Sequence, residues 1–402
     1  MKISNLFKKL FFKRSKYIRY SRQKVTWIDI LAVVKVLKSD FLTQGKLIEK
    51  FEKNLTEISN AEYAVGVNSA TSALHISCLA LGLSEKDYLW TSPITFVASA
   101  NCARYCGAKI DFVDIEPETG LMSINSLREK LETAKLVNKL PKVVIPVHFA
   151  GSSCDMKEIS KLSKIYGFSI IEDASHALGG KYNSKPVGSC EYSDITVFSF
   201  HPVKIITTGE GGAAITNNKV YAQKMKDLRS HCIIKNKNRF EDNITYEWKY
   251  EMQGLGFNYR MNEIQAALGI SQLKRLKKIV SKRNKIFKTY TELLVDMPVN
   301  LLMVPKNTYS SFHLAIVRLE EKSKHNYIFN GLRGSSIGVQ LHYYPVHLQP
   351  YYKKLGFKKG DFPKAEEFYS KIFSLPIYPE LTNSDLLRIT KTLSYLLQNK
   401  EN

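Results

Sequence analysis

The stretch DITVFSFHPVKIITTGEGGAAIT, residues 194–216, sets the first expectations for fold and chemistry. Its apolar run ITVFSF is typical of a strand buried on both faces, and the later run GGAAIT predicts a second strand. Between them lies a short turn with a single lysine, Lys204, among Val203, Ile205 and Ile206. A poorly solvated lysine has a lowered pKa, and its neutral amine can form a Schiff base with an aldehyde. The alternative is that the Lys204 side chain extends to the surface and its charged amine is solvated.

The same alternation of short apolar runs and helical patterns begins at Tyr63. Strands are predicted over residues 63–67, 109–114, 142–147, 168–173, 194–200 and 211–216. Helices are predicted over residues 71–82, 95–107, 123–132 and 156–167. This alternation predicts an α/β protein with a mostly parallel sheet. Beyond Gly254–Tyr259 a long helical pattern over 262–290 leads into mixed short elements. We therefore expect a basic extension over 1–19, a large α/β domain over 20–255 and a smaller C-terminal domain over 256–402.

The composition excludes several classes of protein. The chain has 402 residues, of which 44% are hydrophobic and 24% charged, as expected for a globular protein and not for a disordered one. No apolar run approaches the roughly 20 residues of a membrane-spanning helix. The six cysteines form neither CxxC pairs nor a dense framework, so we expect reduced thiols, a cytoplasmic location and no metal site.

The net charge of +22 raises the question of a nucleic-acid or membrane partner. Two segments without acidic residues carry much of it, residues 1–24 and Lys274–Lys288. The second has apolar residues at helical spacing, which predicts a solvated basic helix face. We recognise no nucleic-acid-binding motif and expect no nucleic-acid partner. Residues 1–19 place Leu6, Phe7 and their neighbours on one side of a basic helix, which predicts weak affinity for an anionic membrane. A frayed, solvated tail is an equal alternative.

Three loops at the ends of predicted strands carry candidate chemistry. The loop NSATSAL, residues 68–74, opens a helix with small hydroxyl residues and suits a phosphate, although an ordinary helix cap has the same pattern. Glu172 and Asp173 end a strand where α/β sheets bind ligands, and a carboxylate there can hold a proton on a heterocyclic nitrogen. A metal ligand or a loop cap is the alternative. His176 either lies against a cofactor ring or is a satisfied buried histidine. Together with Lys204, these groups describe a site for pyridoxal 5′-phosphate (PLP).

The chain resembles the DegT/DnrJ/EryC1/StrS nucleotide-sugar aminotransferases, a family of PLP fold type I. The resemblance runs from about Tyr20 to Leu397. The motifs that carry it are LTQG, NSATSAL, SPITFVASAN, HFAGSSCDM, EDASHALGG, SFHPVKIITTGEGGA, GFNYRMNEIQAALG and HYYPVHLQPYY. It implies a large, mostly parallel-sheet domain and a smaller C-terminal α+β domain.

The resemblance also implies roles for individual residues. Lys204 is implied to hold PLP and to move a proton between the cofactor carbon and the sugar C4, and Asp173 to pair with the pyridinium nitrogen. The residues implied to bind the cofactor are Ala70, Thr71, Phe96, Asp173, His176, Ser199, Lys204 and Asn258. The residues implied to bind substrate are Tyr20, Thr43, Ser69, His342 and Tyr343. Because Asn258 is implied to reach the cofactor phosphate of the neighbouring subunit, we expect a homodimer.

The motifs are most similar to those of members that act in pseudaminic acid synthesis. This similarity implies transfer of an amino group from L-glutamate to C4 of a UDP-linked 4-keto-6-deoxy-HexNAc. A dTDP- or GDP-4-keto sugar is the alternative substrate. The related PLP-dependent sugar dehydratases have histidine at the position of Lys204, so the lysine argues against that activity. Cys232 follows Ser230 and His231 where the family reads SHG, so we expect the loop that follows, near the substrate in the family, to be shaped differently.

Overall fold

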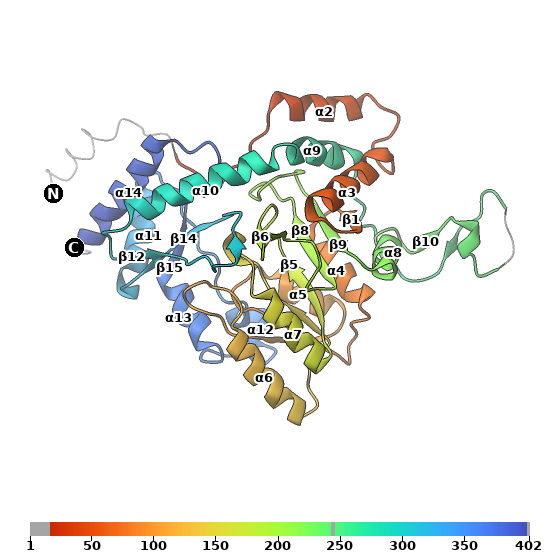
Figure 1. The fold of residues 1–402 in the computed structure, drawn as a ribbon, viewed down its shortest axis with the longest axis horizontal. Helices are drawn as coiled ribbons and strands as arrows, with labels where there is room; N and C mark the ends of the chain where they lie inside the picture. Colours follow the sequence, from red (N-terminus) through yellow and green to blue (C-terminus); the bar gives the residue numbers. More distant parts are fainter. Residues whose placement is uncertain (1–16, 243–245, 400–402) are drawn as a thin grey trace.

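The computed structural model describes residues 17–242 and 246–399, and a seven-stranded sheet lies at the centre of this part of the chain (Figure 1). Its order is β1-β9-β8-β5-β4-β2-β3. The strands are β1 (Tyr63–Val67), β2 (Tyr88–Thr91), β3 (Lys109–Phe112), β4 (Val143–Ile145), β5 (Ser169–Asp173), β8 (Ile195–Ser199) and β9 (Gly212–Thr216). Only β9 runs antiparallel to its neighbours, β1 and β8. The predicted α/β fold with a mostly parallel sheet is confirmed.

Helices follow five of these strands in the chain. They are α4 (Ala70–Ala80), α5 (Ala98–Tyr105), α6 (Ile124–Leu136), α7 (Met156–Tyr166) and α8 (Lys219–Leu228). The side chains of Ser69, Ser123 and Asp155 cap the starts of α4, α6 and α7, because each accepts a hydrogen bond from a backbone N–H in the first turn. Helix α7 ends at Gly167, whose φ of 79° suits glycine. The four helices predicted between residues 71 and 167 are therefore present.

The predicted long helix over 262–290 is two helices. Helix α9 (Glu263–Leu273) packs against α2 (Trp27–Leu37) and α3 (Lys46–Ser59), whereas α10 (Leu276–Leu293) runs toward the C-terminal part of the molecule (Figure 1). The break falls at Arg275, whose ψ of 3° leaves the helical region. The buried carboxylate of Asp29 binds Arg275 Nη2 at 2.5 Å and Ser271 Oγ at 2.6 Å, which ties the end of α9 to α2.

The basic face predicted on this helix is only partly solvated. Its six lysines are exposed, but Arg275 is paired with Asp29 and Arg283 is only 1% exposed. Arg283 Nη1 donates to the backbone oxygens of Phe312, His313 and Ile377, so this guanidinium joins three segments in the interior. The prediction of an exposed side chain was wrong for Arg283, because three backbone carbonyl groups accept hydrogen bonds from its Nη1.

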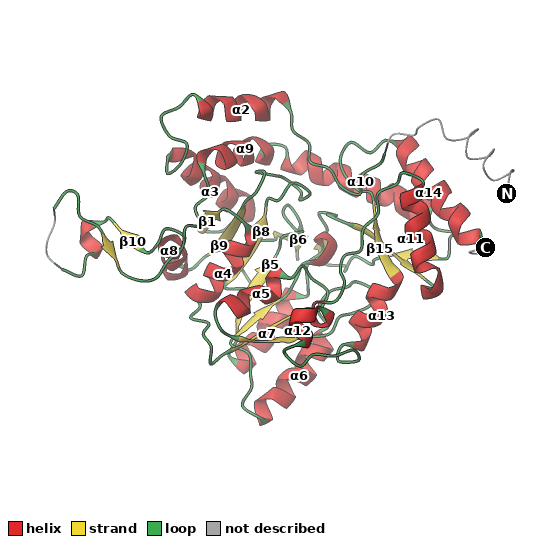
Figure 2. Ribbon diagram, turned by 180° about the vertical axis from the view of Figure 1, so that it is seen from behind, coloured by secondary structure: helices red, strands yellow, loops and turns green. Residues whose placement is uncertain are grey.

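The C-terminal part contains a smaller antiparallel sheet. Its strands, in the order β12-β14-β15, are β12 (Val299–Leu301), β14 (Ala315–Leu319) and β15 (Ile372–Leu375). The helices of this part are α11 (His325–Gly334), α12 (Pro350–Lys353), α13 (Pro363–Lys371) and α14 (Asn383–Gln398). Figure 2 shows β15 beside α11 and α14. Residues 17–19 of the predicted extension are described, and Ile18 is buried and bridges Ile337. The amphipathic segment predicted over 1–19 otherwise lies outside the described residues.

Two small sheets complete the fold. Strands β13 (Thr308–Tyr309), β6 (Lys181–Tyr182) and β7 (Lys185–Pro186) form one of them, and β10 (Ile233–Ile234) and β11 (Glu251–Met252) form the other. The β10–β11 pair belongs to an arm that projects from the body (Figure 1). Short 3-10 helices are η1 (Phe149–Gly151), η2 (Lys237–Arg239), η3 (Lys322–Lys324) and η4 (Val346–Leu348). Within the described ranges, no helix is both long and apolar enough to cross a membrane.

Candidate active site

A cavity of about 590 Å³ lies where the ends of β5 and β8 meet the start of α4 and the C-terminal part of the chain. Most of the residues predicted for the site line this one cavity. They are Tyr20, Ser69, Ala70, Thr71, Phe96, Asp173, His176, Ser199, Lys204, His342 and Tyr343. Thr43 and Asn258 do not line it, and both are exposed elsewhere on the described surface.

Lys204 lies in the turn that follows β8. Its backbone N–H donates to His201 O at 2.9 Å, and the neighbouring Val203 O accepts from Ser21 Oγ at 3.1 Å, so the turn is fixed from two sides. Burial lowers the pKa of Lys204 to about 8, against the opposing effect of the Asp173 charge. A pKa near 8 leaves about a tenth of the amine neutral at pH 7. The side chain lines the cavity, where its amine can act on a bound molecule.

Asp173 and Glu172 are neighbours on β5 with different surroundings. Asp173 lines the cavity and accepts hydrogen bonds from Ser99 Oγ at 2.6 Å and from Ser175 N at 3.1 Å. Glu172 is absent from the cavity lining, because successive side chains of a strand point to opposite faces. It is bound to His148 Nε2 at 2.6 Å and to the hydroxyl groups of Ser193 and Thr196. Burial opposes the Glu172 charge, but these hydrogen bonds and the His148 charge lower its pKa.

The start of α4 is built to receive an anion. Ser69 caps the helix by accepting from Ser72 N at 3.1 Å, and the N–H groups of a first helical turn have no acceptor within the helix. Gly212 on β9 is in close contact with this turn, since a Cβ at that residue would lie 2.4 Å from Ala70 N. Ser199, at the end of β8, also lines the cavity and is the register partner of Gly212. This cradle suits a phosphate group.

Neutral histidines and aromatic side chains form another wall. Tyr343 Oη and His176 Nε2 lie 3.1 Å apart, whereas His176 Nδ1 is buried without a hydrogen-bond partner among the described residues. Burial lowers the pKa of His176, and it lowers that of His342 to about 3, with the Lys204 charge acting in the same direction in both cases. His342 Nδ1 lies 2.8 Å from Ser374 Oγ. The wall is therefore polar and uncharged.

Several residues of the site were not predicted from the sequence, among them His313 and Ser99. His313 lines the cavity, with its ring centroid 4.4 Å from that of His176. Ser99 is fully buried and contacts Asp173. Ser99 lies within the motif SPITFVASAN, but its spacing gives no sign that its hydroxyl group faces the carboxylate. Among the described residues, no group of three or more His, Cys, Asp or Glu side chains is placed to hold a metal ion.

The residues of the cavity fit PLP. The start of α4 offers donors to the phosphate, Asp173 offers a carboxylate to the ring nitrogen, and Lys204 offers an amine of lowered pKa to the aldehyde. The free Nδ1 of His176 faces no protein partner, as expected where a bound molecule completes the wall. The aromatic ring of Phe96, which is 57% exposed, is available for stacking.

Comparison with known proteins finds relatives along almost the whole chain. Residues 26–394 match the DegT/DnrJ/EryC1/StrS aminotransferase family. A UDP-4-amino-4,6-dideoxy-N-acetyl-beta-L-altrosamine transaminase of Campylobacter jejuni is 39% identical over 386 residues, covering 95% of this chain and 98% of the relative. The structure of Helicobacter pylori PseC, an aminotransferase involved in the biosynthesis of pseudoaminic acid, has a TM-score of 0.86 at 34% identity and covers 95% of this chain and 100% of that one.

A second solved structure includes the cofactor in its description. The PLP form of the putative sugar aminotransferase Spr1654 from Streptococcus pneumoniae has a TM-score of 0.86 at 28% identity, covering 95% of this chain and 99% of that chain. The likeness confirms the predicted fold of the type I aminotransferases, and the family match confirms the predicted cofactor. This chain belongs to the DegT/DnrJ/EryC1/StrS family of PLP-dependent nucleotide-sugar aminotransferases.

Proposed function

We propose that the protein moves an amino group from L-glutamate to C4 of a UDP-linked 4-keto-6-deoxy-HexNAc, in pseudaminic acid-type sugar biosynthesis. The observation that carries the reaction type is the placement of Lys204 and Asp173 in one cavity that also receives the start of α4. The sugar is inferred from the altrosamine transaminases of C. jejuni and H. pylori, which are 39% and 35% identical to this chain.

PLP, when bound, supplies an electron sink that stabilises a carbanion on the attached carbon. Asp173 holds the proton on the ring nitrogen, and Ser99 keeps the carboxylate in position through its 2.6 Å hydrogen bond. Lys204, with its lowered pKa, takes and returns the proton at the reacting carbon. Burial is what makes the neutral form of this amine accessible, and burial also keeps the neighbouring His176 and His342 uncharged.

We further propose that the active unit is a homodimer. Thr43 and Asn258 are exposed and lie outside the cavity of their own subunit, as expected for residues that serve a neighbouring subunit. Helix α2 exposes large apolar side chains, among them Trp27 at 77% and Ile28 at 66%. Trp248, in the projecting arm, is also 77% exposed. Apolar surface of this extent on a helix and an arm supports burial against a second copy.

The alternative is another UDP-, dTDP- or GDP-linked 4-keto sugar as the amino acceptor. Cys232, where the family has glycine, adopts a φ of 52°, so the backbone here keeps the left-handed conformation that glycine favours.

We also propose a cytoplasmic location, because all six cysteines are free.

The experiment that tests the substrate is an incubation of the protein with PLP, L-glutamate and a panel of UDP-, dTDP- and GDP-4-keto sugars, followed by identification of the amino sugars formed. Preferred conversion of the UDP-linked 4-keto-6-deoxy-HexNAc is expected. Preferred conversion of a dTDP- or GDP-sugar would select the alternative and leave the reaction type unchanged.

A further inference from the structure

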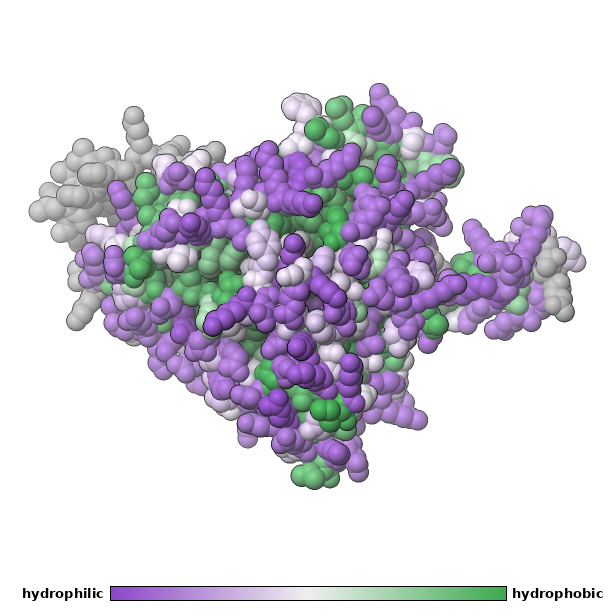
Figure 3. All heavy atoms as spheres, in the orientation of Figure 1, coloured by the Kyte–Doolittle hydropathy of each residue, from purple (hydrophilic) through white to green (hydrophobic). Residues whose placement is uncertain are grey.

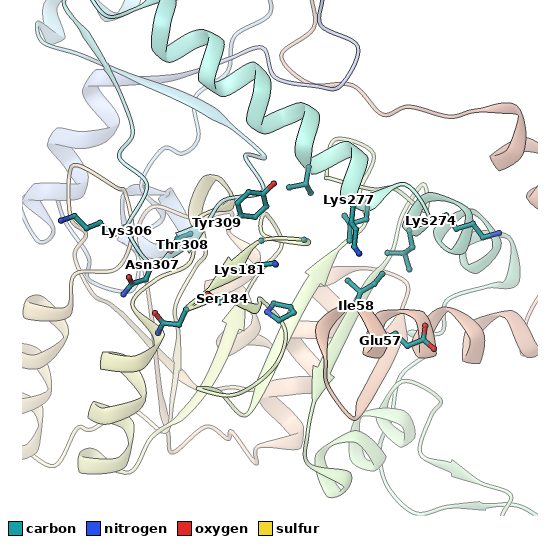
Figure 4. Close-up of a pocket in the computed structure, with 17 residues that line it drawn as sticks. Glu57, Ile58, Lys181, Ser184, Lys274, Lys277, Lys306, Asn307, Thr308 and Tyr309 are labelled. Carbon is teal, nitrogen blue, oxygen red and sulfur yellow. The ribbon is translucent and has the colours of Figure 1, made fainter.

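A second, larger hollow lies away from the aminotransferase cavity and shares no lining residue with it. We name it the lysine groove; its volume is about 1340 Å³. The start of α10 and the end of α3 form one wall, and the small sheet of β6, β7 and β13 forms the other (Figure 4). The two walls come close at Gly179, where a Cβ would lie 3.0 Å from Val280 Cγ2.

The groove carries an unbalanced positive charge. Lys181, Lys274, Lys277 and Lys306 line it and are exposed, and Glu57 is the only acidic residue in its described lining. No ion pair joins any of these four lysines to an acidic group in residues 17–242 and 246–399. Like charges brought together without counter-charges repel one another, and an acidic ligand relieves this repulsion. Lys181 comes from one wall and Lys277 from the other, so a ligand in the groove meets a cation on either side (Figure 4).

The other lining groups indicate the shape of the ligand. The side-chain amides of Asn183 and Asn307 both donate and accept hydrogen bonds, as a peptide backbone requires of its partners. Thr308 Oγ1 is buried and has no hydrogen-bond partner among the described residues. Ile58 is partly exposed and the Tyr309 ring is 43% exposed, which offers contact to apolar side chains. The groove therefore combines charge, backbone-type hydrogen bonding and apolar contact.

We propose that the lysine groove binds an acidic segment of a partner protein, whose Asp and Glu side chains pair with Lys181, Lys274, Lys277 and Lys306. A planar lipid surface could meet the exposed lysines but not the buried hydroxyl group of Thr308. Single-stranded nucleic acid binds best where several aromatic rings alternate with cations, and Tyr309 is the one aromatic residue in the described lining. The basic residues 1–24 of the same chain have the wrong charge to occupy the groove. Figure 3 shows hydrophilic residues along α10 on this face of the molecule.

The test selects binders from a displayed library of random sixteen-residue peptides on the full-length protein loaded with PLP. Enrichment of peptides rich in Asp and Glu is expected. One enriched peptide is then titrated, at physiological salt, against the wild type and the variants Lys181→Glu, Lys277→Glu and Lys282→Glu. Lys282 is exposed on α10 but does not line the groove, so it controls for the general change of charge.

The proposal predicts at least tenfold weaker binding for Lys181→Glu and Lys277→Glu, and a change of less than twofold for Lys282→Glu. Aminotransferase turnover is expected to stay at the wild-type level in all three variants, which shows that they fold. Equal losses in all three variants would overturn the proposal, because they would reflect net charge alone. Selected peptides without acidic residues would also overturn it, as would tighter binding of a sixteen-residue oligo-dT or of anionic vesicles through the same lysines.

Discussion

Replacing each of the two adjacent carboxylates of β5, Asp173 and Glu172, by its amide separates the effect on catalysis from the effect on folding. We predict that Asp173→Asn loses about 100-fold in kcat, whereas Glu172→Gln keeps most of its kcat and loses stability. Asp173 lines the cavity, and an amide cannot hold the proton of the ring nitrogen as a carboxylate does. A hydrogen bond to a charged group contributes about 1.5 to 3 kcal/mol, and a 100-fold change corresponds to about 2.7 kcal/mol.

The stability estimate follows from the contacts of each carboxylate. Ser175 N and Ser99 Oγ donate to different oxygens of Asp173. Asn at 173 keeps its oxygen toward Ser175 N and turns its N–H₂ group toward Ser99, whose hydroxyl group can rotate to accept, so we expect a loss of about 1 kcal/mol in the free energy of unfolding. Glu172 accepts from His148, Ser193 and Thr196 while only 5% exposed. A glutamine there turns an N–H₂ group toward one of these donors, which we expect to cost about 2 to 3 kcal/mol.

The pH dependence of this difference has a definite sign. The pKa of Glu172 is lowered in the folded protein, so its contribution to stability is present above the ordinary glutamate pKa of about 4.3 and is lost as the pH falls through the folded value. The gap in unfolding free energy between wild type and Glu172→Gln is therefore expected at pH 7 and shrinks in acid. Urea titrations followed by circular dichroism measure it, and steady-state assays with L-glutamate and the 4-keto sugar measure kcat. A nearly unchanged kcat in Asp173→Asn together with a large loss in Glu172→Gln would refute the assignment.

Three further predictions concern the rest of the account. Lys204→Ala is expected to abolish turnover and the covalent, borohydride-reducible attachment of PLP; full activity of this variant would remove Lys204 from the mechanism. In a purified heterodimer of Lys204→Ala with Asn258→Ala, one site carries both changes and the other is intact, so about half of the wild-type activity is expected; activity no higher than that of the better parent would show that Asn258 serves its own subunit. Deletion of residues 1–16, which spares the buried Ile18, is expected to leave kcat and KM intact and to abolish sedimentation with anionic vesicles at low salt, since each basic residue near such a surface contributes about 1 kcal/mol. If the full-length protein does not sediment with these vesicles, the membrane hypothesis fails.

The sequence predicted those strands and helices whose residue pattern alone is typical of the structure that they form in the folded protein. Six strands of the central sheet are apolar runs bounded by turn residues, and each is present within a few residues of its predicted range. Strand β2 was not predicted, because its four residues, Tyr88–Thr91, follow a charged turn and are too few to show a period. The helix break at Arg275 was also missed, since it depends on the distant carboxylate of Asp29.

The candidate site shows the same limit. The chemistry of the loop NSATSAL and of the turn around Lys204 could be predicted, because it depends on residue type and on the position directly after a strand. Contacts between segments that are far apart in the chain leave no such signal. Ser99 meets Asp173 across 74 positions, and Arg283 meets the carbonyl of Ile377 across 94. His313 reaches the cavity on a segment that this arginine holds in place.

The most direct test of the central claim follows the nitrogen atom. The protein is incubated with PLP, ¹⁵N-labelled L-glutamate and a UDP-linked 4-keto-6-deoxy-HexNAc, and the nucleotide sugar is analysed by mass spectrometry and NMR, with Lys204→Ala as the control. Our account predicts 2-oxoglutarate and a UDP-sugar with ¹⁵N bonded to C4 from the wild type, and neither product from the variant. Recovery of the keto sugar without ¹⁵N, from protein shown to have bound PLP, would contradict the proposed transfer to this sugar.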